Sequence, residues 1–137
     1  MDSLRILSLA RNQIKKIENL EAVAETLEEL WISYNLLEKL TNLEKLSKLR
    51  VLFLSNNKIA EWAEIERLAQ LPALEDLLLV GNPLTEKYNV SAADNPSKPG
   101  STWRLAVLQR LPGLKKLDGI LVDREEVEQA AAQKAVS

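Results

Sequence analysis

The chain has 137 residues, of which 18 are basic and 20 acidic, and its net charge of −2 gives no general attraction to nucleic acid or to an anionic membrane. It contains no cysteine and no histidine, which excludes disulfide frameworks, thiolate metal sites and catalysis by cysteine or histidine. We expect a reducing compartment such as the cytoplasm, because small secreted repeat proteins usually carry disulfide-stapled caps. We expect neither a membrane span nor a targeting peptide, since no apolar run approaches the roughly 20 residues that cross a bilayer.

Leucines recur at a fixed spacing in the first part of the chain. Segments with the pattern L-x-x-L-x-[L/I]-x-x-N-x-[L/I] begin at Leu4, Leu27, Leu49 and Leu74, and the repeats are 23, 22 and 25 residues long. Such self-similarity decides the architecture before any single residue is considered. It predicts an α/β fold of the leucine-rich repeat type, a solenoid with short parallel strands on its concave face and helical or 3₁₀ segments on its convex face.

The third repeat shows how the pattern shapes the chain. Leu52 and Leu54 are two residues apart, so both point into the core from one side of a short strand. Asn57 follows where the chain must turn away from the sheet, and its amide can pair with backbone groups that the turn leaves free. The same place in the other repeats is held by Asn12, Asn35 and Asn82. We therefore expect a ladder of stacked asparagines.

After each turn the chain returns along the convex side. In the third repeat the apolar spacing lengthens to about three residues, through Trp62, Ile65 and Leu68, which predicts a helix there. We place Trp62 on the inner side of that helix, in the core. In the first repeat, residues 21–26 predict one or two helical turns.

Beyond the fourth strand the pattern breaks. Residues 90–102 are rich in serine, proline, asparagine and glycine, which predicts a loop. Residues 103–111 have helical spacing, and Pro112-Gly113 ends that helix before one more short strand. We therefore expect one leucine-rich repeat domain over residues 1–122, with a C-terminal cap at 103–119.

The last segment, residues 123–137, predicts a helical tail. Asp123 is a suitable N-cap, and Glu125 and Glu126 fall in the first turn, where the helix dipole favours acids. The apolar side of this helix is weak and consists mainly of alanines. Two interpretations remain open: the helix projects from the domain or docks on a partner, or it is a fraying tail.

At the other end, the chain begins inside the repeat pattern at Leu4, with little before it to cover the first repeat. The terminal repeats of a solenoid need a polar or helical cap. We expect that an N-terminal cap is missing, so that the chain is a fragment or another chain or segment covers this edge. The alternative is that residues 1–3 and charged neighbours suffice.

The outward strand positions predict an interaction site. The central outward position holds Ser8, Trp31, Phe53 and Leu78 in successive strands. Because adjacent strands lie about 4.8 Å apart, the last three should form one apolar stripe, as at the centre of a protein interface. The alternative is that neighbours cover these side chains. The expected partner-binding residues are Trp31, Phe53, Leu78, Glu29, Val51, Asp76, Ser33 and Ser55.

The charged residues near the stripe indicate a structural role and not a catalytic one. Arg5, Glu28, Arg50 and Glu75 alternate in sign across four strands, and neighbouring opposite charges stabilise a sheet modestly. Glu29 and Asp76 would lie about 10 Å apart, two strands away from each other, on an open sheet. No glycine-rich phosphate loop or metal-ligand cluster accompanies them. We therefore expect a non-enzymatic protein without catalytic residues, metal or cofactor.

Two stretches carry a more specific resemblance. They are KKIENLEAVAETLEELWISYN, which contains the Trp31 strand, and LPGLKKLDG in the cap. From residue 4 to about residue 129, the chain resembles the outer-arm dynein light chain 1 family of cilia and flagella, within the wider group of repeats similar to the phosphatase-1 regulator. It departs from that family in lacking an N-terminal helical cap and further repeat sequence, and in a longer insertion at 91–101.

The resemblance implies a non-catalytic subunit of the ciliary or flagellar axoneme, a part of the cytoskeleton. It would bind the motor or microtubule-binding region of an outer-arm dynein heavy chain through the concave face and tune motility. The resemblance also implies an approach to tubulin in the microtubule, for which the candidate basic residues are Arg104, Lys115, Lys116 and Arg124. Two alternatives stay open, a regulatory subunit of a protein phosphatase and a scaffold of the splicing type.

Overall fold

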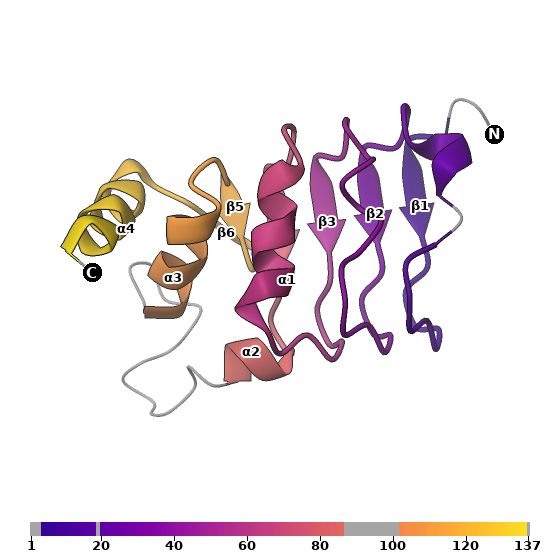
Figure 1. The fold of residues 1–137 in the computed structure, drawn as a ribbon, viewed down its shortest axis with the longest axis horizontal. Helices are drawn as coiled ribbons and strands as arrows, with labels where there is room; N and C mark the ends of the chain where they lie inside the picture. The colour runs from indigo at the N-terminus through magenta and orange to yellow at the C-terminus, as the bar shows by residue number, and fades with distance from the viewer. Residues whose placement is uncertain (1–3, 19, 87–101, 137) are drawn as a thin grey trace.

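The computed structural model describes residues 4–18, 20–86 and 102–136. Its strands form one six-stranded sheet in chain order (Figure 1). The strands are β1 (Ile6–Ser8), β2 (Glu29–Trp31), β3 (Val51–Phe53), β4 (Asp76–Leu78), β5 (Lys116–Leu117) and β6 (Ile120–Leu121). Strands β1 to β5 are parallel, and β6 turns back antiparallel to β5. The predicted α/β solenoid of leucine-rich repeat type is confirmed.

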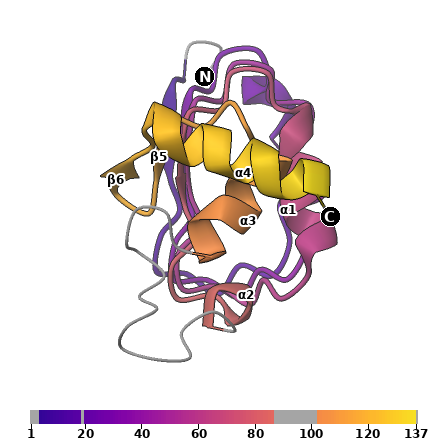
Figure 2. The ribbon, with the colours of Figure 1, turned by 90° about the vertical axis from the view of Figure 1, so that its left-hand side faces the viewer.

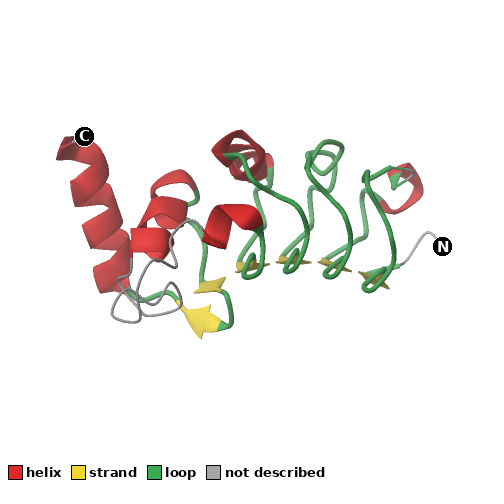
Figure 3. Ribbon diagram, turned by 90° about the horizontal axis from the view of Figure 1, so that it is seen from below, coloured by secondary structure: helices red, strands yellow, loops and turns green. Residues whose placement is uncertain are grey.

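The helices lie on one side of this sheet. They are η1 (Glu21–Val23), α1 (Trp62–Arg67), η2 (Leu68–Gln70), α2 (Pro83–Glu86), α3 (Thr102–Arg110) and α4 (Arg124–Val136). Figures 2 and 3 show the strands along one side of the coil and the described helices away from them. The opposite side of the sheet, which we call the open face, carries the outward strand residues. The helices predicted at 21–26, from Trp62 onward and at 103–111 are all present.

The core lies between the sheet and the convex segments. One inward residue from each of the strands β1 to β5 forms a continuous row of Leu7, Leu30, Leu52, Leu77 and Leu117. Leu30, Leu52 and Leu77 are fully buried, and each such leucine contributes about 1.5–3 kcal/mol through removal of its side chain from water. In the first repeat the apolar residues Leu4 and Leu7 are only partly buried.

Asparagines link successive repeats as predicted. The Asn35 amide nitrogen donates to the Leu9 carbonyl at 3.0 Å, and its oxygen accepts from the Ile14 N–H at 3.0 Å. Asn57 and Asn82 make the equivalent donations to Ile32 and Leu54 at 3.1 and 2.8 Å. Each buried amide thus satisfies backbone groups of two repeats at once.

Some elements differ from the sequence predictions. The short helix α2 and strand β6 were not predicted, because each is too short for its apolar period to repeat in the sequence. Trp62 is only partly buried, between the Trp103 ring, with centroids 5.6 Å apart, and the Arg110 guanidinium at 3.9 Å. The loop predicted at 90–102 lies outside the described residues except for residue 102, which begins α3.

The first half of helix α4 packs on the domain, so it neither projects nor frays. It packs against α3, and Ala130 is buried in the core. The N-cap prediction is confirmed, because the Asp123 carboxylate accepts a hydrogen bond from the Glu126 N–H at 2.8 Å. Helices α3 and α4 together close the C-terminal end of the solenoid (Figures 1 and 2).

Candidate functional site

The strand register places the expected stripe on the open face. Ser8, Trp31, Phe53 and Leu78 are direct neighbours across β1 to β4. The Trp31 and Phe53 rings stack with their centroids 6.0 Å apart and an interplanar angle of 22°, an arrangement that stabilises an aromatic pair. The Trp31 indole N–H donates to the Glu29 carboxylate at 3.2 Å, which fixes the ring on the sheet.

The exposed apolar side chains of the molecule gather around this stripe. Among the described residues, the large hydrophobic side chains that are exposed are Ile6, Trp31, Tyr34, Val80 and Leu121. Ile6, Trp31 and Leu121 belong to strands of the sheet, and Tyr34 and Val80 to the segments that directly follow β2 and β4. Apolar exposure concentrated on one side of a molecule marks an interaction surface.

The structure adds residues that the sequence prediction left out of the site. Leu121 lies opposite Lys116 in the β5–β6 pair, and Lys116 lies opposite Asp76. Leu121 therefore shares the outward row of Asp76 and is 72% exposed. Because β6 was not predicted, only its pairing with β5 in the structure could identify this residue as part of the open face.

Three of the expected contact residues are buried, which corrects the prediction for Val51, Ser33 and Ser55. Val51 lies between the longer side chains of Glu29 and Asp76 in the same row, which leaves a valine little surface. The Ser55 hydroxyl donates to the Ser33 hydroxyl at 2.9 Å, so these two groups pair with each other just beyond the ends of β2 and β3.

A second correction concerns Arg104, which was expected on a basic outer surface. Its side chain is fully buried, and Nε lies 2.7 Å from the Glu126 carboxylate. Its other nitrogens donate to the carbonyls of Leu117 and Ile120 at 2.6 and 3.2 Å. A buried guanidinium needs several acceptors, which here are the Glu126 carboxylate of α4 and the carbonyls of β5 and β6. Arg104 therefore cannot face a microtubule.

The other expected basic residues lie at the surface beside carboxylates. The Lys115 ammonium is 3.6 Å from Glu75, and Arg124 is 3.1 Å from Glu128. Lys116 is partly exposed and neighbours Asp76 in the sheet. These three cations remain accessible to a partner.

Of the predicted row of alternating charge, Arg5 and Glu28 form an ion pair, whereas Arg50 pairs with Glu29, which lies outside that row. Arg5 and Glu28 are 2.7 Å apart, and their hydrogen bond holds the pKa of the Glu28 carboxyl below its ordinary value. Arg50 lies 3.5 Å from Glu29 on the open face. Burial raises the pKa of Asp76, while the nearby Lys116 and Arg50 partly counteract that rise. The acids beside the stripe thus differ: Glu29 is paired, and Asp76 is partly desolvated.

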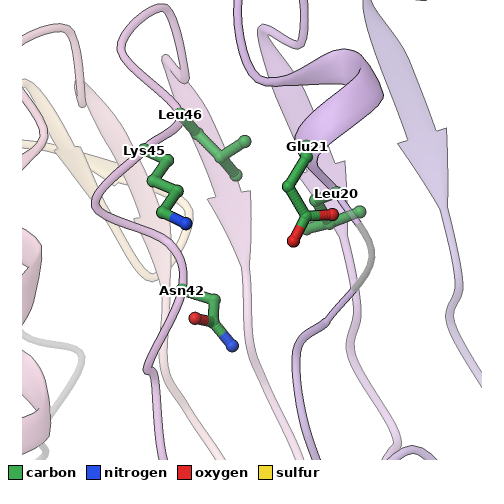
Figure 4. A pocket seen from close by; sticks show the side chains of 5 residues that line it. All are labelled: Leu20, Glu21, Asn42, Lys45 and Leu46. Atoms are coloured by element: carbon green, nitrogen blue, oxygen red, sulfur yellow. The ribbon is translucent and has the colours of Figure 1, made fainter.

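A hollow on the convex side is too small for a ligand. Figure 4 shows it between the returns of the first two repeats, lined by Glu21, Asn42 and Lys45 among others, and its volume is about 10 Å³. That is about the space that one water molecule needs.

The described residues contain no group of three acidic side chains placed to hold a metal ion. No described helix is long and apolar enough to cross a membrane.

Comparison with curated proteins confirms the resemblance to axonemal dynein light chains. The chain is 60% identical over 130 residues to dynein axonemal light chain 1 of Chlamydomonas reinhardtii, and the match covers 95% of this chain and 63% of the relative. The protein of the same name from Homo sapiens is 50% identical over 129 residues, with 94% and 63% covered. The chain therefore spans less than two thirds of the length of these relatives.

Solved structures share the fold. The Drosophila melanogaster SNF/U2A' complex contains a chain that matches with a TM-score of 0.62 at 24% identity, covering 93% of this chain and 79% of that one. An internalin of Listeria monocytogenes matches with a TM-score of 0.59 at 24% identity, covering 94% and 39%. The family model described as "Leucine-rich repeat" fits residues 1–136. The chain belongs to the leucine-rich repeat family.

Proposed function

We propose that this chain acts as a non-catalytic light chain of an axonemal outer-arm dynein. In this proposal it works in the axoneme of a cilium or flagellum, binds the motor or microtubule-binding region of a dynein heavy chain, and tunes motility. Its similarity to dynein axonemal light chain 1 of Chlamydomonas reinhardtii supports the class of function. The single observation that carries the binding site is the concentration of exposed apolar side chains on the open face.

The contact that we propose centres on the stacked Trp31 and Phe53 rings. Leu78 extends this surface by one strand, and Glu29 and Asp76 border it with negative charge. Rigid aromatic residues with a polar rim favour an apolar ridge of a partner, because both surfaces then leave water. A basic residue beside that ridge would pair with the acids. Val51, Ser33 and Ser55 lie on the same face but are covered by their neighbours, so we leave them out of the contact.

A contact with tubulin is a separate part of the proposal. Lys115, Lys116 and Arg124 are the cations that could meet an acidic surface, since Arg104 is enclosed in the cap. Each has a carboxylate nearby in this chain, so the net attraction is weak and falls with salt. We therefore assign the stable interaction to the open face.

The experiment is a pull-down from salt-extracted axonemes with the immobilised chain. The test variant combines Trp31→Glu and Phe53→Glu. A matched control combines Ala63→Glu and Gln70→Glu, which adds the same charge at exposed convex positions. Circular dichroism verifies that both variants fold.

We expect the native chain and the convex control to retain a dynein heavy chain. The open-face variant should not retain it. Recovery of a phosphatase catalytic subunit or of splicing proteins in place of dynein would overturn the proposed function. Equal heavy-chain binding by all three proteins would overturn the proposed face.

A further inference from the structure

A groove of about 280 Å³ lies between η2 and the end of α3, away from the open face. Its two lips are the turns Leu71-Pro72-Ala73-Leu74 and Leu111-Pro112-Gly113-Leu114, which share the sequence L-P-x-L. These turns lead into β4 and β5, which pair directly through Asp76 and Lys116. The two turns therefore lie side by side.

The walls of this groove are aliphatic. Leu68, Leu71 and Leu111 line it and are almost fully buried, while Pro72 and Pro112 are exposed at the lips. The equivalent turn of the second repeat is Leu46-Ser47-Lys48-Leu49, which carries a serine and a lysine where the groove has proline with alanine or glycine. The apolar lips are thus a feature of this end of the molecule.

Arg110 lines the same groove and has an unused donor. Its guanidinium lies 3.9 Å above the Trp62 ring, and Nη1 donates to the Ala106 carbonyl at 2.9 Å. The Nε atom is buried without a hydrogen-bond partner, and the Glu66 carboxylate at 3.6 Å is too distant for a hydrogen bond. Buried donors are nearly always paired, so an unpaired one beside a groove marks a place for an acceptor.

We propose that the groove binds a peptide segment that carries an aliphatic side chain next to a carboxylate. The aliphatic side chain lies between the two L-P-x-L turns, and the carboxylate accepts from Arg110 in place of Glu66. Guanidinium and carboxylate are complementary in charge and planar geometry. The volume suits one such side chain and excludes a whole helix, which distinguishes this site from the open face.

The test uses the complete chain labelled with ¹⁵N and two small probes, N-acetyl-leucine and N-acetyl-leucinamide. Both have the same side chain, but only the first has a carboxylate. We expect N-acetyl-leucine to shift the backbone amide signals of Gly113 and of the groove turns, and to bind about tenfold more tightly than the amide, a difference of roughly 1.4 kcal/mol. Equal binding of the two probes would overturn the role of Arg110.

Three variants locate the site. Gly113→Leu adds a large side chain to a residue that lines the groove, and it does so without strain, because a Cβ at Gly113 meets nothing within 4 Å and its φ is not positive. Lys48→Leu places the same side chain at the equivalent turn of the second repeat and serves as the matched control. We expect Gly113→Leu to abolish the signal shifts and Lys48→Leu to leave them unchanged. Binding that survives Gly113→Leu would overturn the site.

Variants of Arg110 and Glu66 should change the affinity for N-acetyl-leucine in opposite directions. Arg110→Gln removes the guanidinium and its positive charge and should weaken N-acetyl-leucine binding to the level of the amide. Glu66→Gln removes the competing carboxylate, which is exposed and lies beside Arg110, and should strengthen binding several-fold. A weaker affinity in Glu66→Gln would contradict the proposal, because it would show that Glu66 supports the site.

Discussion

The guanidinium of Arg104 and the carboxylate of Glu126 form a buried ion pair, with Nε and Oε2 2.7 Å apart, that joins α3 to α4. The pair is bidentate, since a second nitrogen of Arg104 donates to the other Glu126 oxygen at 3.0 Å. Arg104 also binds carbonyls of the β5–β6 region. One arginine of α3 therefore holds α4, β5 and β6 together in the C-terminal cap.

Removal of one partner of this pair should destabilise the chain strongly. Glu126→Ala leaves a buried guanidinium without its carboxylate, and we expect a loss of about 3–5 kcal/mol in the free energy of unfolding by urea. Arg104→Met combined with Glu126→Leu should cost less, because no charge is then buried alone. Arg124→Ala, which breaks the exposed pair with Glu128, is the control and should leave the unfolding midpoint unchanged. A wild-type midpoint for Glu126→Ala would refute this account of the cap.

Glu64 on α1 should also stabilise the fold, through a hydrogen bond to the backbone. Its buried carboxylate accepts from the Leu40 N–H of the preceding repeat at 2.7 Å and pairs with Arg67 at 3.1 Å. Glu64→Ala leaves that buried N–H unpaired and should cost about 1–3 kcal/mol. Glu64→Gln keeps an acceptor and should lose less. Thermal unfolding of both variants checks the order, which an equal loss would contradict.

Gly81 stands where only glycine fits. Its φ is +89°, and an added Cβ would lie 2.4 Å from the Asn56 side-chain oxygen. Gly81→Ala should destabilise the chain by about 1–2 kcal/mol from backbone strain alone, and by more from the clash. Asn56→Gly in the same chain removes the side-chain oxygen without straining position 56, whose own φ is +56°, and should recover only the part due to the clash. Urea unfolding of the single and double variants separates the two costs, and full recovery would argue against strain.

Asp76 should make the stability of the fold depend on pH. Because burial raises its pKa in the folded chain, the folded state favours the protonated form more than the unfolded state does. This contribution is fully present below the unfolded pKa, about 3.9, and is lost as the pH rises through the folded pKa. Asp76→Asn should therefore raise the urea midpoint at pH 7 and change it less at pH 3.5. A lower midpoint at pH 7 would show that the pairing with Lys116 outweighs burial.

The repeat pattern was sufficient to predict the architecture and the central stripe. A side-chain period of two residues, together with the leucine spacing, placed Trp31, Phe53 and Leu78 in one row, and the strand register confirms that row. The asparagine ladder followed from the same spacing, because each turn leaves the same backbone groups to be paired.

The rest of the site depends on packing between segments far apart in sequence. Arginine is usually found at the surface of a protein. Arg104 is buried only because α4 packs over it. Val51 is buried by its neighbours across the sheet, which a strand period cannot foresee. Leu121 belongs to the open face because β6 pairs with β5, and two-residue strands leave no recognisable pattern.

The most direct test of the proposed function replaces Phe53 with the photo-crosslinking amino acid p-benzoylphenylalanine, and Ala63 on the convex side with the same residue as control. Each chain is irradiated in an axonemal salt extract, and mass spectrometry identifies the crosslinked peptides. Our account predicts that position 53 crosslinks to the motor or microtubule-binding region of a dynein heavy chain and that position 63 does not. Crosslinks to dynein from position 63 alone, or to an unrelated protein from position 53, would contradict it.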